Sequence, residues 1–160
     1  MYIYVLKKLK IMKFAIYKTS AFIGVLLFLI SCKVEPQAIE YGKEQCNFCS
    51  MTIVDKAHAS QYVTTKGKQF KFDAIECLIN DINNKNDNDI AVMLVANYNK
   101  PGEMINAKTA SYLISEEIKS PMSVNLSAFS SLEKATEMQQ KYIGDIYTWD
   151  SLKVKIFEIQ

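Results

Sequence analysis

A short polar segment at residues 83–89 (Asn-Asn-Lys-Asn-Asp-Asn-Asp) divides the apolar part of this chain into two halves. Such a run of turn-forming residues interrupts both strand and helix patterns. Without the leader described below, residues 32–160 are enough for one domain, or for two small modules that share a core. The fold must therefore be assembled from short elements on either side of this break.

Apolar periodicity and turn residues predict these elements. Before the break we expect strands at residues 51–54, 60–65 and 69–72, followed by a helix at 73–83 capped by Asp73. After the break we expect strands at 90–98, 103–106 and 145–149, and a helix at 130–143. A helix-like patch is expected at 109–114 and an edge strand or turn within 118–125. The pattern does not assign a type of secondary structure to the tail at 153–159.

The two halves contain an internal echo. Residues 67–70 and 78–79 match residues 102–105 and 113–114 at an offset of 35, and residues 51–53 match residues 122–124 at an offset of 71. The repeats are short, but the second makes Met122 the counterpart of Met51. This echo predicts two related modules.

The front of the chain has the composition of an export leader. Residues 1–31 contain five lysines and no acid, and residues 21–30 are an unbroken apolar run that is too short to cross a bilayer. The run ends at Leu29-Ile30-Ser31-Cys32, which resembles a bacterial lipobox, so Cys32 is the predicted lipidation site, and an ordinary cleavage site is the alternative. We expect residues 1–31 to be a signal peptide and residues 32–44 a tether, with translation starting at Met1 or Met12.

Charge excludes one class of partner. Fourteen of the 19 lysines follow Cys32, against 17 acids, and the chain has no arginine. Proteins that bind nucleic acids use arginine for forked contacts to phosphate and guanine, so we expect no nucleic-acid partner. Motifs for hydrolases or nucleotide-binding enzymes are also absent from the sequence.

A sulfur motif, Cys46-x-x-Cys49-x-Met51, follows the tether. Thiolate and thioether are soft donors that favour Cu(I) over hard cations. If the chain runs extended after Cys49, Cys49 and Met51 share one face of the strand. The Cys-x-x-Cys pair also fits a redox dithiol, half of a zinc site or a local disulfide, and Met51 also fits a core position.

Three further side chains are candidate ligands. Cys77 leaves an odd number of cysteines after Cys32 is lipidated, although a buried helical cysteine is usually a small apolar residue. His58 is the single histidine, and its imidazole suits copper, whereas a surface position without a ligand role is the alternative. Met122, after Pro121, is a candidate ligand or a core residue.

The chain resembles the NosL family, the lipoprotein copper chaperones of nitrous-oxide reductase maturation. The resemblance rests on residues spread from the leader to the C-terminal region: Cys32, Cys46-x-x-Cys49-x-Met51, Phe70 and Phe72-Asp73-Ala74, residues 107–113, Ser120-Pro121-Met122, Ala128-Phe129, Ala135 and Tyr147-Thr148-Trp149-Asp150. It implies an α+β fold of two related ββα-type modules packed together, at residues 45–89 and 90–160, and a Cu(I) site of cysteine and methionine sulfur. Family members usually have glycine where this chain has Ser50, so a positive φ there would strain the loop.

These observations predict a membrane-anchored copper chaperone, not an enzyme, on the outer or cytoplasmic membrane. Its expected ligands are Cys46, Cys49, Met51, Met122 and, with less support, His58. The resemblance implies that it delivers Cu(I) to an exported cuproenzyme such as nitrous-oxide reductase, with the help of a membrane transporter. The alternatives are a zinc-binding interaction module and a Cys-x-x-Cys thiol-disulfide oxidoreductase, although the strand expected after Cys49 does not suit the latter.

Overall fold

A computed structural model describes residues 34–83 and 85–159. The leader and Cys32 lie outside the described residues, so their predicted roles stay predictions. Residues 34–160 form one compact unit with its own buried core. Among the described residues, no helix has the length and apolar character needed to cross a membrane.

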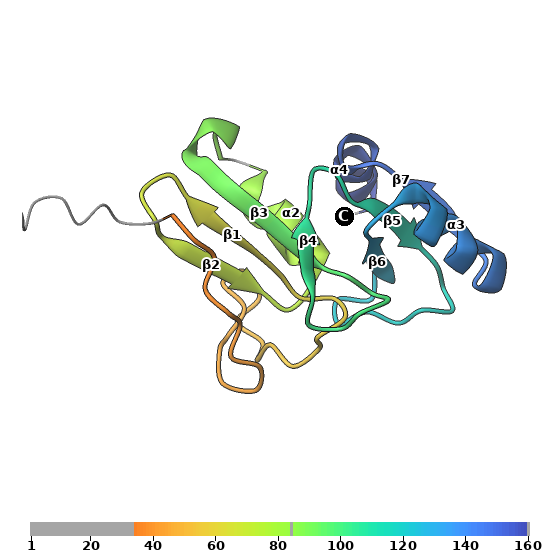
Figure 1. The fold of residues 1–160 in the computed structure, drawn as a ribbon, viewed down its shortest axis with the longest axis horizontal. Helices are drawn as coiled ribbons and strands as arrows, with labels where there is room; N and C mark the ends of the chain where they lie inside the picture. The colour runs from red at the N-terminus through yellow and green to blue at the C-terminus, as the bar shows by residue number, and fades with distance from the viewer. Residues whose placement is uncertain (1–33, 84, 160) are drawn as a thin grey trace, which may run out of the picture. The chain divides into compact units, whose positions relative to one another are not determined.

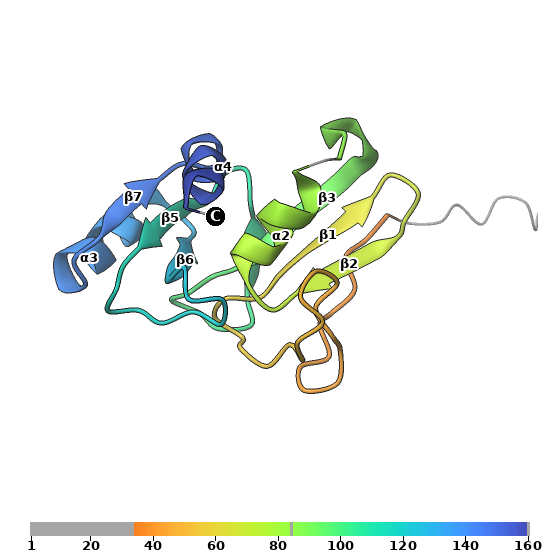
Figure 2. The same ribbon diagram turned by 180° about the vertical axis from the view of Figure 1, so that it is seen from behind.

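The first sheet has four antiparallel strands in the order β2-β1-β3-β4 (Figure 1). These strands are β1 (Ser60–Thr64), β2 (Gln69–Phe72), β3 (Ile90–Ala96) and β4 (Met104–Asn106). Helix α2 (Ile75–Ile82) follows β2 and packs against β1 and β2, as the view from behind shows (Figure 2). Apolar residues recur along α2 at helical spacing, and they are buried in the core. A short 3-10 turn (Asp87–Asp89) leads into β3.

The second sheet has three antiparallel strands in the order β6-β5-β7. They are β5 (Ser111–Ile114), β6 (Leu126–Phe129) and β7 (Asp145–Tyr147), flanked by the helices α3 (Leu132–Lys141) and α4 (Trp149–Glu158). The Ser131 side chain caps α3 by accepting a hydrogen bond from the Lys134 amide. The Thr148 side chain caps α4 by accepting a hydrogen bond from the Ser151 amide.

One core joins the two sheets. Tyr62 and Ile75 from the first sheet and its helix belong to the same buried cluster as Tyr112, Leu126 and Leu152 from the second. Backbone contact continues this link, because the Tyr98 amide donates to the Ala128 carbonyl at 2.9 Å. The predicted α+β class is confirmed, with two antiparallel sheets that share one buried core.

The division between the sheets falls later in the chain than the module boundary expected at residues 89 and 90. Strand β3 was expected to open the second module, but it pairs with β1, and β4 then pairs with β3. Residues up to Asn106 therefore complete the first sheet. The polar segment 83–89 is a connection within one sheet, because antiparallel pairing of β3 with β1 needs only a return of the chain after α2.

Four local expectations differ from the structure. Residues 51–54 form no strand, and only Thr52 makes an isolated bridge, to Gln45. The helix-like patch at 109–114 contains strand β5, and the strand expected at 145–149 ends at Tyr147, because Trp149 opens α4. Helix α4 also takes in most of the tail at 153–159, whose type the sequence left open. Asp73 does not cap α2, since Ala74 occupies the cap position without a side-chain hydrogen bond. Short apolar runs fit either period, so pairing with neighbouring strands decides the outcome.

Candidate metal centre

A tight turn carries the Cys-x-x-Cys motif. The Cys46 amide donates to the Met51 carbonyl at 2.8 Å, and the Ser50 amide donates to the Cys46 carbonyl at 3.0 Å. Ser50 has φ 64, in the left-handed region that favours glycine. The turn therefore folds back on itself at the position where the family usually has glycine, and the extended segment that would place Cys49 and Met51 on one face is not formed.

The end of β2 holds this turn in place. The Asn47 amide donates to the Lys71 carbonyl at 2.9 Å, and the Lys71 amide donates to Asn47 Oδ1 at 2.6 Å. Lys71 Nζ, almost fully buried, donates to Glu44 Oε1 at 2.7 Å and to the Ala38 carbonyl at 2.8 Å. Burial of a lysine is tolerated because its charge is paired and its donors are bonded. The tether and the turn are thus both fastened to β2.

Four donor side chains meet where β2 passes into α2. Single ligand atoms of Cys46, Cys49, Asp73 and Cys77 all lie within 4.8 Å of one another. Cys49 Sγ donates to Asp73 Oδ1 at 3.3 Å, and Cys77 Sγ lies 3.6 Å from the same oxygen. The turn supplies Cys46 and Cys49, whereas Asp73, just before the cap residue of α2, and Cys77, in the first turn of α2, supply the other two. We call these four residues the sulfur cluster.

Three of the four residues of the sulfur cluster are buried. Cys46 is 2% exposed, Asp73 is 2% exposed and Cys77 is fully enclosed, whereas Cys49 is only partly covered. All three cysteines are free thiols. An ion would therefore reach the cluster past Cys49.

The thiols are electrostatically unequal. Hydrogen bonding from the Cys77 thiol lowers the pKa of Cys46 to about 6. Burial, together with hydrogen bonds to Cys46 and Asp73, raises the pKa of Cys49 to about 11, and the pKa of Cys77 is also raised, chiefly by its hydrogen bond to Cys46. The single Cys77 proton has two acceptors in reach, the Cys46 sulfur and Asp73 Oδ1. One thiolate is therefore stabilised among protonated neighbours, which is a starting point for binding a cation.

The two predicted methionine ligands have different surroundings. Met51 is 49% exposed beside the sulfur cluster's turn. Met122 is partly buried against the main core, in a loop where Ser120 Oγ donates to Glu76 Oε1 at 3.1 Å. Glu76 directly precedes Cys77, so the loop that carries Met122 contacts the helix that carries part of the cluster.

His58 is not among the four cluster residues, and it is buried instead of lying at the surface. The whole residue is 3% exposed. Its Nδ1 lies 2.7 Å from Asp55 Oδ2 and its Nε2 lies 3.2 Å from Ser127 Oγ on β6. Both ring nitrogens are engaged, so His58 fastens the loop before β1 to the second sheet.

Sequence reasoning left two members of the cluster out of the expected ligand set. Asp73 is predicted to be a helix cap, and Cys77 is predicted to be a small core residue, with a ligand role as the open alternative. In a helix that began at Asp73, a spacing of four residues would place both on one face, and the odd cysteine count already marked Cys77 as unexplained. Only the fold brings that face against the Cys46 turn.

The fold and the cluster define a small α+β protein with a thiol-rich candidate site for a soft metal ion. The chain matches the NosL family model over residues 36–157 and belongs to the NosL family. Its fold is similar to the crystal structure of the copper chaperone NosL from Shewanella denitrificans, with 19% identity and a TM-score of 0.63, over 72% of this chain and 93% of that chain. A comparison with curated proteins found no significant match.

Proposed function

We propose that this protein is a copper chaperone that binds Cu(I) through sulfur and passes it on. The supporting observation is the sulfur cluster, in which three thiols and one carboxylate bring single donor atoms within 4.8 Å of one another. Thiolate sulfur favours Cu(I), and the similar protein from Shewanella denitrificans is itself a copper chaperone. Cys46 and Cys49 are the proposed thiolate ligands, with Cys77 within reach of both.

Release of the ion is as important as binding for a chaperone. Cys49 and the exposed thioether of Met51 lie on the accessible side of the turn, and Met122 is the second thioether that we propose as a donor. A site of two or three sulfur ligands leaves room for an incoming ligand before an old one leaves. A closed site of four fixed ligands retains its ion, as structural zinc sites do.

The proposal extends to location and partner. A lipid on Cys32 would anchor the protein to the outer or cytoplasmic membrane, facing the periplasm or the cell exterior. Anchoring raises the effective concentration of the donor near a membrane-associated acceptor. The family relationship favours an exported cuproenzyme, nitrous-oxide reductase in particular, as the acceptor of copper, with a membrane transporter as a further partner.

A zinc-binding module is the second candidate, because three thiols and a carboxylate are also a four-ligand set for zinc. The thiol-disulfide oxidoreductase has less support, since the Cys-x-x-Cys turn is followed by an isolated bridge and not by a helix in the described structure. A redox dithiol is usually activated at a helix N-terminus.

The variant Asp73→Asn separates the two metals. The hard carboxylate is a ligand for zinc but only a hydrogen-bond partner of the thiols for Cu(I). Its removal should weaken zinc binding roughly 10–100-fold or more. Because the Asp73 hydrogen bond raises the pKa of Cys49, the same variant should leave Cu(I) affinity unchanged or slightly increased at neutral pH.

The measurement is an anaerobic titration with Cu(I) and with zinc, each in competition with a chelator. Asp145→Asn, an exposed substitution on β7, is the matched control for the loss of one negative charge. Cu(I) affinity that falls as much as zinc affinity in Asp73→Asn would refute the sulfur-only ligand set. Wild-type protein that does not bind Cu(I) under reducing conditions would refute the function itself.

A further inference from the structure

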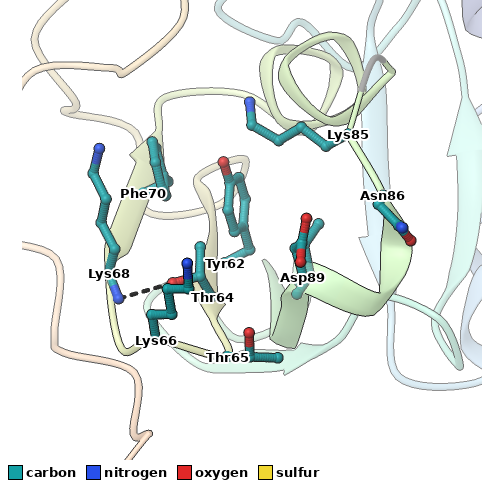
Figure 3. A pocket seen from close by; sticks show the side chains of 10 residues that line it. Tyr62, Thr64, Thr65, Lys66, Lys68, Phe70, Lys85, Asn86 and Asp89 are labelled. Atoms are coloured by element: carbon teal, nitrogen blue, oxygen red, sulfur yellow. Dashed lines mark hydrogen bonds between the residues drawn. The ribbon is translucent and has the colours of Figure 1, made fainter.

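A hollow at the far end of the first sheet is unrelated to the sulfur cluster. It measures about 510 Å³, and the stacked rings of Tyr62 and Phe70, whose centroids are 4.6 Å apart, are part of its lining. Three lysines line it: Lys66, Lys68 and Lys85 (Figure 3). We call it the lysine pocket. Aromatic rings together with cationic side chains are a combination that proteins use at the boundary between water and lipid.

The charges of the lysine pocket are poorly balanced. Lys85 Nζ pairs with Asp81 at 2.7 Å, but Lys66 and Lys68 are exposed and form no ion pair within the described part of the chain. Lys68 Nζ instead lies 4.6 Å from the centre of the Phe70 ring. One acid, Asp89, lines the pocket. In a mature chain whose acids outnumber its lysines, this surface is set apart by its positive charge.

The start of the described chain lies beside this pocket. The Gln37 amide donates to Gln69 Oε1 at 3.2 Å, and Gln69 Nε2 donates to the Glu35 carbonyl at 3.0 Å. Gln69 is the neighbour of Lys68 and Phe70, two residues of the pocket. Cys32 precedes Glu35 by three residues, a span of at most about 10 Å. The described chain therefore starts beside the lysine pocket, three residues after the predicted anchor Cys32.

We infer that the lysine pocket docks on the headgroups of anionic phospholipids, with Lys66 and Lys68 contacting phosphate and Phe70 at the interface. The inference rests on the proposed lipid at Cys32, which would hold this end of the sheet against the bilayer. Charge complementarity and the short connection to the anchor are its two arguments. A basic surface next to a lipid chain supplies the second contact that stable membrane attachment needs.

Docking of this kind would also orient the sulfur cluster. A strand rises about 3.3 Å per residue, so the path along β2 from Lys68 to Phe72, next to Asp73, spans roughly 13 Å. The lysine pocket and the cluster lie at opposite ends of that path. The metal site would then face away from the membrane surface, toward an approaching acceptor.

Binding to vesicles tests the inference. Residues 34–160, which contain the whole described core, are prepared without the leader, and their folding is checked by circular dichroism. Cosedimentation is measured with vesicles of phosphatidylcholine alone and of phosphatidylcholine mixed with phosphatidylglycerol. Each lysine near an anionic surface contributes to binding, so Lys66→Gln with Lys68→Gln should weaken binding to the anionic vesicles roughly thirtyfold.

The matched control is Lys108→Gln with Lys141→Gln, which removes the same charge from two exposed lysines outside the pocket. The control should bind as the wild type does, and added salt should weaken the wild type more than the pocket variant. Equal binding by both double variants would overturn the inference, as would equal binding to both kinds of vesicle. Binding of inorganic phosphate in place of vesicles would overturn the lipid as the source of the phosphate.

These outcomes are independent of the proposed copper function. The pocket variant should bind Cu(I) as the wild type does, and a variant without Cys46 should still bind the anionic vesicles. Mass spectrometry of the membrane-extracted protein tests the lipid on Cys32 separately. A chain without that lipid would contradict the anchor, while vesicle binding would still report on the pocket.

Discussion

Two loops of this protein each contain a serine with a positive φ next to a methionine, but they expose that methionine to different extents. In residues 46–51, Ser50 adopts φ 64 directly before Met51, and in residues 120–125, Ser123 adopts φ 64 directly after Met122. The first loop leaves its methionine 49% exposed in the turn that carries Cys46 and Cys49, whereas the second packs its methionine on the core. We call them the Met51 loop and the Met122 loop.

The difference shows what each loop contributes. The Met51 loop is fixed by backbone hydrogen bonds and by Asn47, whose Oδ1 accepts from the Lys71 amide, and its methionine is left half exposed. The Met122 loop is fixed by Ser120, which bonds both the Asn125 amide and Glu76, and its methionine packs on the core. Exchange of a soft ion needs a donor that is held but not enclosed, and Cys49 and Met51 of the Met51 loop have these properties. The predictions below test that contrast.

The largest effect is expected from the thiols of the Met51 loop. Cys49→Ser should lower Cu(I) affinity by more than the roughly 10–100-fold that loss of a supporting residue costs, because serine replaces a thiolate with a weak neutral donor. The measurement is an anaerobic competition titration. Ser120→Ala in the Met122 loop is the control and should retain nearly full affinity. If Cys49→Ser and Ser120→Ala bind alike, the Met51 loop is not the copper site.

The protonation of the cluster predicts the next effect. Binding to the Cys46 and Cys49 thiolates must displace the proton of Cys49, whose pKa is raised to about 11, but not that of Cys46, whose pKa is lowered to about 6. Between these values one proton leaves for each Cu(I) bound, so affinity should rise about tenfold per pH unit and more steeply below pH 6.

Titration at neutral pH and at about one and two units above it measures this slope. A slope near two would add the thiol of Cys77, whose pKa is also raised, to the ligand set. A flat profile would show that no protonated thiol takes part and would move the copper site away from the Met51 loop.

Much of the fold could be predicted from local patterns. Strands β1 and β2 lie where strands were expected, and α3 lies within the helix expected at residues 130–143. The partner of β3 could not be predicted in this way, because its apolar run fits the centre of either sheet. Pairing between distant strands depends on packing of the whole core, which periodicity does not encode.

The candidate site was predictable in part. Cys46 and Cys49 follow from their spacing alone. The contribution of Asp73 and Cys77 depends on how the start of α2 packs on the turn, and that contact joins residues more than 20 positions apart. The positive φ of Ser50 also bends the chain where sequence reasoning considered an extended segment. The glycine that family members usually have at this position was the indication that the chain bends there.

The methionines give a smaller and sharper contrast. Met51→Leu keeps the volume but removes the thioether of an exposed residue, so it should weaken Cu(I) binding about tenfold with little change in stability. Met122→Ala should lower the free energy of unfolding by about 1–2 kcal/mol, because its side chain packs on the core. Met122→Leu, which preserves packing, tests its copper role separately. Urea unfolding and the same titration provide the two measurements.

If Met122→Leu weakens Cu(I) binding as strongly as Met51→Leu, both loops supply a ligand and the contrast between them concerns packing alone. If neither leucine variant changes Cu(I) affinity, the thiols suffice and the methionines are structural.

The smallest effect is expected at the two serines. Each is held at φ 64, where a side chain costs about 1–2 kcal/mol, whereas glycine adopts this conformation freely and loses more entropy on folding. Ser50→Gly and Ser123→Gly should therefore each raise the free energy of unfolding by about 0.5–1 kcal/mol, measured by urea unfolding. Ser151→Gly, at the capping box of α4, is the opposing control and should destabilise.

Copper affinity then distinguishes the two serine variants. Backbone hydrogen bonds already close the Met51 loop around Ser50, so Ser50→Gly should change Cu(I) affinity by less than about threefold, the range of a loop that is already organised. A large gain in Ser50→Gly, with none in Ser123→Gly, would mean that strain at Ser50 opposes the bound geometry. The serine in place of the family's glycine would then weaken retention of copper and favour its transfer.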